Sequence, residues 1–176
     1  ISKMLSIMLS LVDDFQQYEF VIAGAPSQSL DFYKKIIGSK NIALVDNKTY
    51  DLLSVSYAAL VTSGTATLET ALFKVPQVVC YKGSIISYQI AKRIITLRFI
   101  SLVNLIMDKE VVKELIQKDF TKKNLTKELA MILDDNHRSK IFENYYQLEQ
   151  KLGGKGASKN TATSIISKLK KDELCN

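Results

Sequence analysis

The sequence is poor in the residue types that build metal centres, disulfide frameworks and histidine-based active sites. Its 176 residues include one histidine, His137, and two cysteines, Cys80 and Cys175. A single imidazole excludes any site that needs two, and two thiols cannot form a disulfide scaffold or a structural zinc site. Cys80 lies inside an apolar run and is expected to be an inert buried thiol.

Long apolar runs are also missing. No stretch of about 18 uncharged apolar residues exists, so no membrane-spanning helix is predicted. Residues 1–12 resemble the core of a secretory signal, but no small-residue cleavage site follows them. Their apolar positions recur with a helical period, which predicts an amphipathic helix from Ile1 to Phe15. The chain begins with Ile and not Met, which suggests a fragment whose upstream part is missing.

The composition is that of a globular domain. Hydrophobic residues make up 47% of the chain and charged residues 24%, and 176 residues are enough to bury a core without a disulfide or metal. The net charge of +6, from 24 basic and 18 acidic residues, is compatible with anionic ligands or surfaces.

Short apolar runs alternate with helical segments over the first hundred residues. The predicted strands are Tyr18–Ala25, Ile42–Val45, Tyr57–Thr62 and Gln77–Tyr81. The predicted helices between and after them are Ser27–Ile37, Tyr50–Ser56, Ser63–Lys74 and Ile85–Arg98. Strands that are apolar on both faces indicate a parallel sheet covered on both sides. The fold class is therefore α/β, a Rossmann-like unit that lacks its first strand.

The character of the chain changes after residue 99. The stretch FISLVNLIMDKEVV has no clean period, and three helical segments follow it, at Asn124–Asp134, Arg138–Leu152 and Ser158–Lys171. We therefore expect a Rossmann-like domain over residues 1–112, a C-terminal helical segment over 113–171 and a frayed tail over 172–176.

One strand-to-helix turn has the chemistry of an anion site. In open α/β sheets, ligands bind at the carboxyl ends of the strands. The turn VTSGTATLE offers small residues, hydroxyls and the free N–H groups of a helix start, at Ser63, Gly64, Thr65, Ala66 and Thr67. This arrangement suits a phosphate or diphosphate. It is neither a Walker loop nor a G-x-G-x-x-G motif.

Glu69 lies one to two turns into the same helix and has two interpretations. It either complements the helix dipole or accepts hydrogen bonds from the vicinal hydroxyls of a ribose. A capping box is excluded, because Ala66 stands three residues earlier in place of Ser or Thr.

A basic stretch follows the last predicted strand. Lys82, Lys92, Arg93 and Arg98 occur before the next acidic residue, Asp108. The stretch is either a helix with solvated cations or a contact for an anionic membrane or a phosphorylated substrate.

Several blocks together resemble the lipid-A-disaccharide synthases. These are SGTATLETALFKVPQVVCYK, the following YQIAKR, then FISLVNLIMDKEVVKELIQ and the closing LGGKGAS. The resemblance implies the C-terminal, donor-binding half of a GT-B glycosyltransferase. It implies an inverting transfer of 2,3-diacylglucosamine from UDP-2,3-diacylglucosamine to 2,3-diacylglucosamine 1-phosphate (lipid X), which releases UDP and gives the lipid A disaccharide 1-phosphate. No metal or other cofactor is expected.

The resemblance also assigns residues. Ser63, Gly64, Thr65, Ala66 and Thr67 match the diphosphate-binding turn, and Glu69 matches the glutamate that contacts the ribose. Blocks that face the cleft in the family contain Tyr81, Lys82, Ser101 and Asn104.

The family's N-terminal domain, with its proposed catalytic base, has no counterpart in this sequence. The resemblance therefore implies that this chain alone is inactive. It also implies a cytoplasmic protein that is peripheral on the inner membrane, that forms a possible homodimer and that binds no nucleic acid. Two alternatives stay open: another UDP-sugar enzyme of the same architecture, such as a cell-wall glucosaminyltransferase or an epimerase, or a non-catalytic basic module that contacts nucleic acid or membrane.

Overall fold

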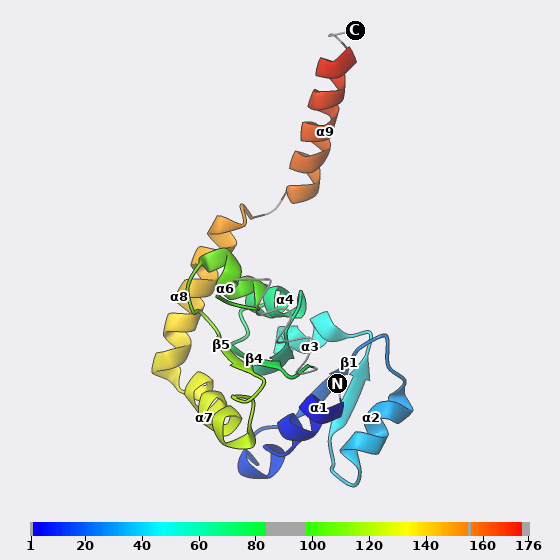
Figure 1. Ribbon diagram of the computed structural model, residues 1–176, viewed down its shortest axis with the longest axis vertical. Helices are drawn as coiled ribbons and strands as arrows, with labels where there is room; N and C mark the ends of the chain where they lie inside the picture. The colour runs from blue at the N-terminus through cyan, green and yellow to red at the C-terminus, as the bar shows by residue number, and fades with distance from the viewer. Residues whose placement is uncertain (1, 84–97, 155, 174–176) are drawn as a thin grey trace.

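The computed structural model describes residues 2–83, 98–154 and 156–173 (Figure 1). Every strand pair in these residues is parallel, and helices connect the strands, which confirms the predicted α/β class. The strands are β1 (Val21–Gly24), β2 (Ala43–Asp46), β3 (Ala59–Thr62), β4 (Gln77–Tyr81) and β5 (Lys113–Ile116).

The predicted helices that fall within the described residues are present with shifted ends. The first helix ends at Leu9, well before Phe15, and the chain continues as a short 3-10 helix. The helix expected at residues 85–98 lies outside the described residues apart from Arg98. The helices are α1 (Ser2–Leu9), η1 (Val12–Asp14), α2 (Leu30–Ile37), α3 (Thr49–Val55), α4 (Ala66–Leu72), α6 (Leu102–Met107), α7 (Lys122–Leu133), α8 (Asp135–Lys151) and α9 (Ala157–Glu173).

The strands form two parallel sheets where the sequence indicated one. In the described part of the chain, β1 pairs only with β2, and β4 lies between β3 and β5. Thr62 at the end of β3 stands opposite Cys80, and Tyr81 at the end of β4 stands opposite Ile116. This register brings the carboxyl ends of β3, β4 and β5 to one edge of the sheet.

Strand β5 and helix α6 were not expected from the sequence. The segment 113–171, which we expected to be helical, begins with β5, and this strand completes the three-stranded sheet. Lys113 and Glu114 interrupt the apolar pattern of the strand. Charged side chains are common on edge strands, and β5 lies at the edge of its sheet in the described residues.

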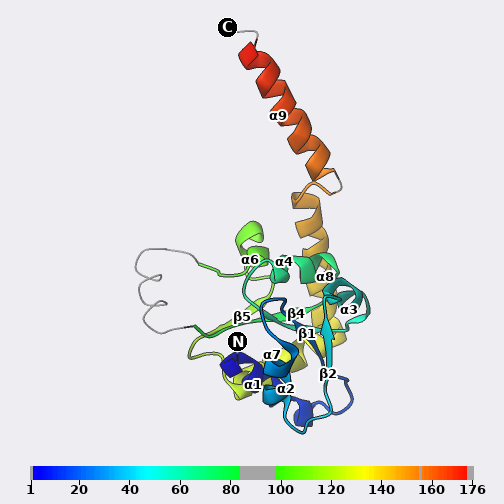
Figure 2. The ribbon, with the colours of Figure 1, turned by 90° about the vertical axis from the view of Figure 1, so that its right-hand side faces the viewer.

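The core forms around β4. Val78, Val79 and Cys80 of this strand are fully buried. Helix α4 packs on one face of the sheet and α7 on the other (Figure 2), and α8 closes the core with Tyr145 and Leu148. Covering both faces explains why Val78, Val79 and Cys80, which alternate between the two faces, are all apolar.

Arg138 joins the helical segment to the sheet. Its guanidinium carbon lies 3.6 Å from the centre of the Tyr57 ring, and Nη1 donates to the carbonyl oxygens of Tyr57 (2.9 Å) and Ile132 (3.2 Å). Two hydrogen bonds to carbonyl oxygens and a cation–π contact offset the free-energy cost of desolvating a buried guanidinium. Helix α8 is thereby fixed against the start of β3.

Helix α9 extends away from the rest of the chain (Figures 1 and 2). Its apolar residues recur with a helical period on one side, and Ile165, Ile166 and Leu169 are 54%, 52% and 59% exposed.

The burial of Cys80 gives a chemical probe of global unfolding. Desolvation raises the pKa of the Cys80 thiol to about 12, so at pH 8 only about one thiol in ten thousand is the reactive thiolate. In a Cys175→Ser variant, we expect a disulfide reagent to label no thiol in the native protein and one thiol in guanidinium. Native labelling at the rate measured in guanidinium would contradict the packing described for β4.

Candidate functional site

The turn between β3 and α4 is open to solvent. Gly64 and Thr65 are exposed, and Gly64 has a φ of 143°, a conformation that favours glycine. No side chain caps α4, and within the described residues the N–H groups of Gly64, Thr65 and Ala66 donate to no acceptor. Three free donors at the positive end of a helix favour an anion.

The hydroxyls of this turn are used differently from our expectation. We expected the hydroxyls of Ser63, Thr65 and Thr67 to converge on a ligand. Ser63 Oγ donates to the carbonyl oxygen of Ile100 at 3.2 Å, and the buried Thr67 Oγ1 donates to that of Gly64 at 2.8 Å. These two hydroxyls therefore hold the turn in place. The hydroxyl of the exposed Thr65 makes no hydrogen bond within the described residues.

Glu69 is half-buried and lines a hollow beside the turn. The other residues around this hollow of about 390 Å³ are Asn47, Lys48, Thr49, Tyr50 and Asp51. They follow the carboxyl end of β2 and form the start of α3, so the hollow lies on the side of the strands where α/β proteins bind ligands. The carboxylate therefore reaches a space that a small ligand could occupy.

Tyr50 is a residue of this hollow that the sequence analysis missed. Its hydroxyl donates to Glu69 Oε1 at 3.2 Å, and its ring stacks on Phe73 at 5.4 Å. The hydrogen bond to the carboxylate, together with its negative charge, raises the pKa of the Tyr50 hydroxyl. The sequence did place Tyr50 at a helix start after a strand, where ligands often bind. It could not show the bond to Glu69, because the two residues lie 19 positions apart in the chain.

Tyr81 and Lys82 lie at the same edge of the sheet as the turn. Because Thr62 is in register with Cys80, the residues that follow each of them, Ser63 and Tyr81, are also neighbours. Tyr81 is half-buried and its ring lies over Gly83, whereas Lys82 is exposed. Lys82 supplies a positive charge beyond the end of β4.

Ser101 and Asn104 are fully buried and serve an internal network. Asn104 Nδ2 donates to the Val112 carbonyl oxygen, and its Oδ1 accepts from the N–H groups of Val111 and Val112. All polar groups of the amide thus have protein partners. The expected contact of these two residues with a ligand stays a prediction, and their burial favours a positioning role.

Glu114 is the centre of this network. Its carboxylate accepts hydrogen bonds from the N–H groups of Ile100 and Ser101 (both 2.9 Å), from Ser101 Oγ (2.7 Å) and from Asn104 Nδ2 (2.9 Å). The same segment accepts the bond from Ser63 through the Ile100 carbonyl. A carboxylate on β5 therefore fixes the loop that supports the β3–α4 turn.

Removing the charge of Glu114 tests this support. A Glu114→Gln substitution places an amide NH₂ among groups that all donate, so we expect a loss of about 2 kcal/mol in the free energy of unfolding. Urea unfolding followed by circular dichroism measures it. The matched control is Glu110→Gln, because Glu110 makes only an exposed ion pair with Lys113, worth less than about 1 kcal/mol. Equal midpoints for the two variants would contradict the proposed role of Glu114.

Among the described residues, no group of three or more His, Cys, Asp or Glu side chains is arranged so that it could hold a metal ion. None of their helices has the length and apolar character needed to cross a bilayer.

Comparison with known proteins identifies relatives along almost the whole chain. The family model described as lipid-A-disaccharide synthetase matches residues 2–168. A lipid-A-disaccharide synthase of Syntrophus aciditrophicus is 33% identical over 181 aligned residues, covering 98% of this chain and 47% of the relative. Enzymes of the same name from Geobacter sulfurreducens and Coxiella burnetii are 34% and 31% identical, covering 74% and 94% of this chain and 34% and 45% of the relatives.

The chain thus spans about half the length, or less, of these curated relatives. The matched region includes the β3–α4 turn, Glu69 and the Glu114 network. The match confirms the resemblance found in the sequence blocks. The chain belongs to the lipid-A-disaccharide synthase family.

Proposed function

We propose that this chain is the donor-binding part of a lipid A glycosyltransferase and binds UDP-2,3-diacylglucosamine at the carboxyl edge of its strands. The observation that carries the proposal is the uncapped start of α4 beside the half-buried Glu69. Free N–H groups and a carboxylate at adjacent positions match the two polar parts of a nucleoside diphosphate. Membership of the family supplies the reaction.

The diphosphate would accept hydrogen bonds from the N–H groups of Gly64, Thr65 and Ala66, with Ser63 and Thr67 shaping the turn. These donors are fixed before the ligand binds, so they stabilise the charge that develops on the leaving UDP without reorganising. Lys82 and Tyr81, beyond the adjacent strand end, would contribute a positive charge and an aromatic wall.

The ribose hydroxyls would donate to Glu69. A carboxylate presents two oxygens and can accept from both hydroxyls of a vicinal pair. The bond from Tyr50 occupies Oε1 and leaves Oε2 without a partner in the described residues. The nucleoside would then lie in the hollow formed with residues 47–51.

Ser101 and Asn104 would position the loop that supports the diphosphate turn and would not contact the ligand themselves. Both bind the Glu114 carboxylate, and this network fixes the carbonyl that Ser63 contacts. Weakening the network would displace the diphosphate turn without removing any donor to the ligand.

The complete reaction breaks the bond between the sugar C1 and the diphosphate oxygen of UDP. It forms a bond from C1 to a hydroxyl of 2,3-diacylglucosamine 1-phosphate, with inversion at C1. The hydroxyl proton passes to a base that we expect in the N-terminal domain of the complete enzyme. Both substrates carry acyl chains, which supports an enzyme that is cytoplasmic and peripheral on the inner membrane. A homodimer is compatible with the exposed apolar residues of α9.

UDP binding can be measured by thermal unfolding. A ligand at a hundred times its Kd stabilises the native state by about 2.7 kcal/mol, which corresponds to a rise of about 5–10 °C in Tm for a chain of this size. In the Glu69→Gln variant, the loss of charge-assisted bonds should raise the Kd for UDP about tenfold or more. Glu143→Gln is the matched control, because Glu143 is exposed on α8, and it should bind UDP like the unsubstituted chain.

The result that contradicts the proposal is a Tm that UDP leaves unchanged, or equal UDP affinity in the Glu69→Gln and Glu143→Gln variants. If UDP has no effect but an oligonucleotide or anionic vesicles bind with steep salt dependence, the non-catalytic module becomes the better explanation. UDP-glucosamine can also be compared with and without its acyl chains. If both forms stabilise the chain equally, another UDP-sugar enzyme becomes the better explanation.

A further inference from the structure

Two aromatic side chains stack on each other at the surface of the protein. The ring centres of Tyr50 and Phe73 lie 5.4 Å apart, and the two residues are 57% and 39% exposed. Within the described residues, both lie outside the buried cluster around β4 and the second one formed by Leu5, Leu9 and Tyr33. An exposed pair adds little to the stability of the fold, because much of its apolar surface stays in water. Aromatic surface that the core does not use is typical of binding sites.

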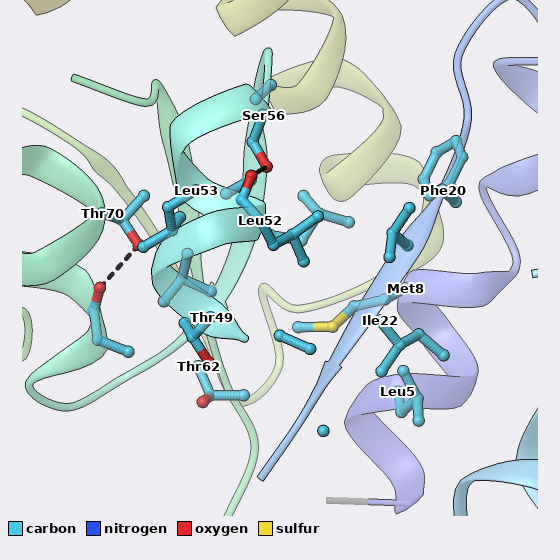
Figure 3. Close-up of a pocket in the computed structure, with 18 of the residues that line it drawn as sticks. Leu5, Met8, Phe20, Ile22, Thr49, Leu52, Leu53, Ser56, Thr62 and Thr70 are labelled. Carbon is cyan, nitrogen blue, oxygen red and sulfur yellow. Dashed lines mark hydrogen bonds between the residues drawn. The ribbon is translucent and has the colours of Figure 1, made fainter. Parts of the chain in front are cut away.

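Helix α3 directs different residues to the interior and to the site. Leu52 and Leu53 line the apolar cavity to which residues of both sheets contribute (Figure 3). Tyr50, two and three residues earlier, lines the outer hollow that contains Glu69. The leucines therefore anchor α3 to the fold, and Tyr50 is left for contacts outside the core.

The Tyr50 ring is fixed before any ligand binds. Its hydroxyl donates to Glu69 Oε1 at 3.2 Å, and Phe73 covers one face of the ring. The hollow is bordered by Tyr50 and not by Phe73. Tyr50 therefore stands between Phe73 and the hollow, with its uncovered face available to a ligand there. A side chain that is already oriented loses little conformational freedom when a ligand binds.

Helix α4 presents its groups in the order in which a nucleotide carries its parts. Ala66, Glu69 and Phe73 stand at i, i+3 and i+7, so they share one face of the helix. At about 1.5 Å per residue, this face spans about 10 Å. A diphosphate at the free N–H groups and a ribose at Glu69 would place the base beside Tyr50, because the ribose carbon that bears the base is next to the one that bears the 2′-hydroxyl.

The charges of the hollow suit the neutral end of such a ligand. Its lining includes the carboxylates of Glu69 and Asp51 as well as the ammonium group of Lys48. Two carboxylates disfavour a phosphate in the hollow, since like charges repel. A nucleobase is uncharged at neutral pH and has an extended π face. The hollow is therefore the base end of the site, and the β3–α4 turn is the phosphate end.

We propose that Tyr50 is the base-binding residue of this site, and that the uracil ring of the UDP donor stacks on the face of Tyr50 that Phe73 leaves free. This inference rests on the proposed function and adds the residue that distinguishes a nucleoside diphosphate from a plain diphosphate. The bond to Glu69 orients the ring, and the ring supplies the contact. Stacking of a base on an aromatic side chain changes affinity by about tenfold or more.

The test uses the whole chain and UDP, with Kd measured by calorimetry. Tyr50→Leu removes the ring and should raise the Kd for UDP about tenfold. Tyr50→Phe keeps the ring and should change the Kd by less than about threefold. The matched control is Tyr146→Leu, because Tyr146 is exposed on α8, and it should bind UDP like the unsubstituted chain. The Tm of each unliganded variant checks that it folds.

Nuclear magnetic resonance of bound UDP gives a readout that does not depend on any variant. A base that stacks on an aromatic ring lies in its ring current, so the uracil H5 and H6 signals should move upfield when UDP binds the unsubstituted chain. The upfield shift should persist with Tyr50→Phe and be lost with Tyr50→Leu. The phosphorus signals of the diphosphate should respond to binding in every case, because the β3–α4 turn is unchanged.

The inference is overturned if UDP binds the unsubstituted chain without the upfield shift, or if the Tyr50→Leu and Tyr146→Leu variants bind UDP equally. An equal loss of affinity in Tyr50→Phe and Tyr50→Leu also overturns it, because the hydroxyl and not the ring would then matter. An unsubstituted chain that binds no UDP is a different result: it contradicts the proposed function itself, and the role of Tyr50 falls with it.

Discussion

Parallel pairing of β4 on both of its edges is the constraint on which this structure depends. Because β4 is apolar on both faces, helices must cover it from two sides, and α4 and α7 do so. The pairing aligns the carboxyl ends of three strands, which places the β3–α4 turn, Tyr81 and Ile116 at one edge. The alignment brings Tyr81 and Lys82 to the turn, whereas the free N–H groups and Glu69 all lie within residues 63–69.

Buried polar groups in this protein position backbone more than they contact ligands. Gln77, at the start of β4, donates from Nε2 to the Thr67 carbonyl oxygen at 2.8 Å and to Tyr145 Oη at 3.3 Å. The Glu114 carboxylate does the same for the loop at residues 100–101. Gln77 thus holds the first turn of α4 directly, through the Thr67 carbonyl. Glu114 holds it indirectly, through the loop that Ser63 contacts. A rigid turn keeps its free donors aimed at solvent, where an anion can bind.

The regular part of the fold could be predicted because its signals are local. Apolar runs with helices between them indicate β1 to β4 correctly, and the small residues after Thr62 indicate an open turn. β5 could not be found this way. Lys113 and Glu114 make it polar, and Glu114 is needed there for the loop 13 and 14 residues earlier. The partition into two sheets depends on pairing across the fold, which periodicity does not contain.

The candidate site shows the same division. Glu69 and the turn were predicted from residue type and spacing, and both lie at open surfaces. Tyr50 was missed, because only the packing of α3 against α4 brings its hydroxyl to Glu69. Ser101 and Asn104 were expected to face a cleft, but the sequence contains no indication that Glu114 would bind them. Polar side chains whose partner is another distant side chain are the ones that sequence reasoning assigns poorly.

Helix α9 has a thermodynamic consequence for the whole chain. Its side chains at residues 158–169 are all exposed, so this part of the helix adds no buried apolar area to the folded core. An unpacked helix of 17 residues depends on its intrinsic propensity and is marginal in water. Heating would therefore melt α9 gradually, as a sloping far-ultraviolet baseline, ahead of the cooperative transition of the sheets. The unfolding enthalpy of that transition would be smaller than expected for 176 residues, because α9 would not unfold as part of it.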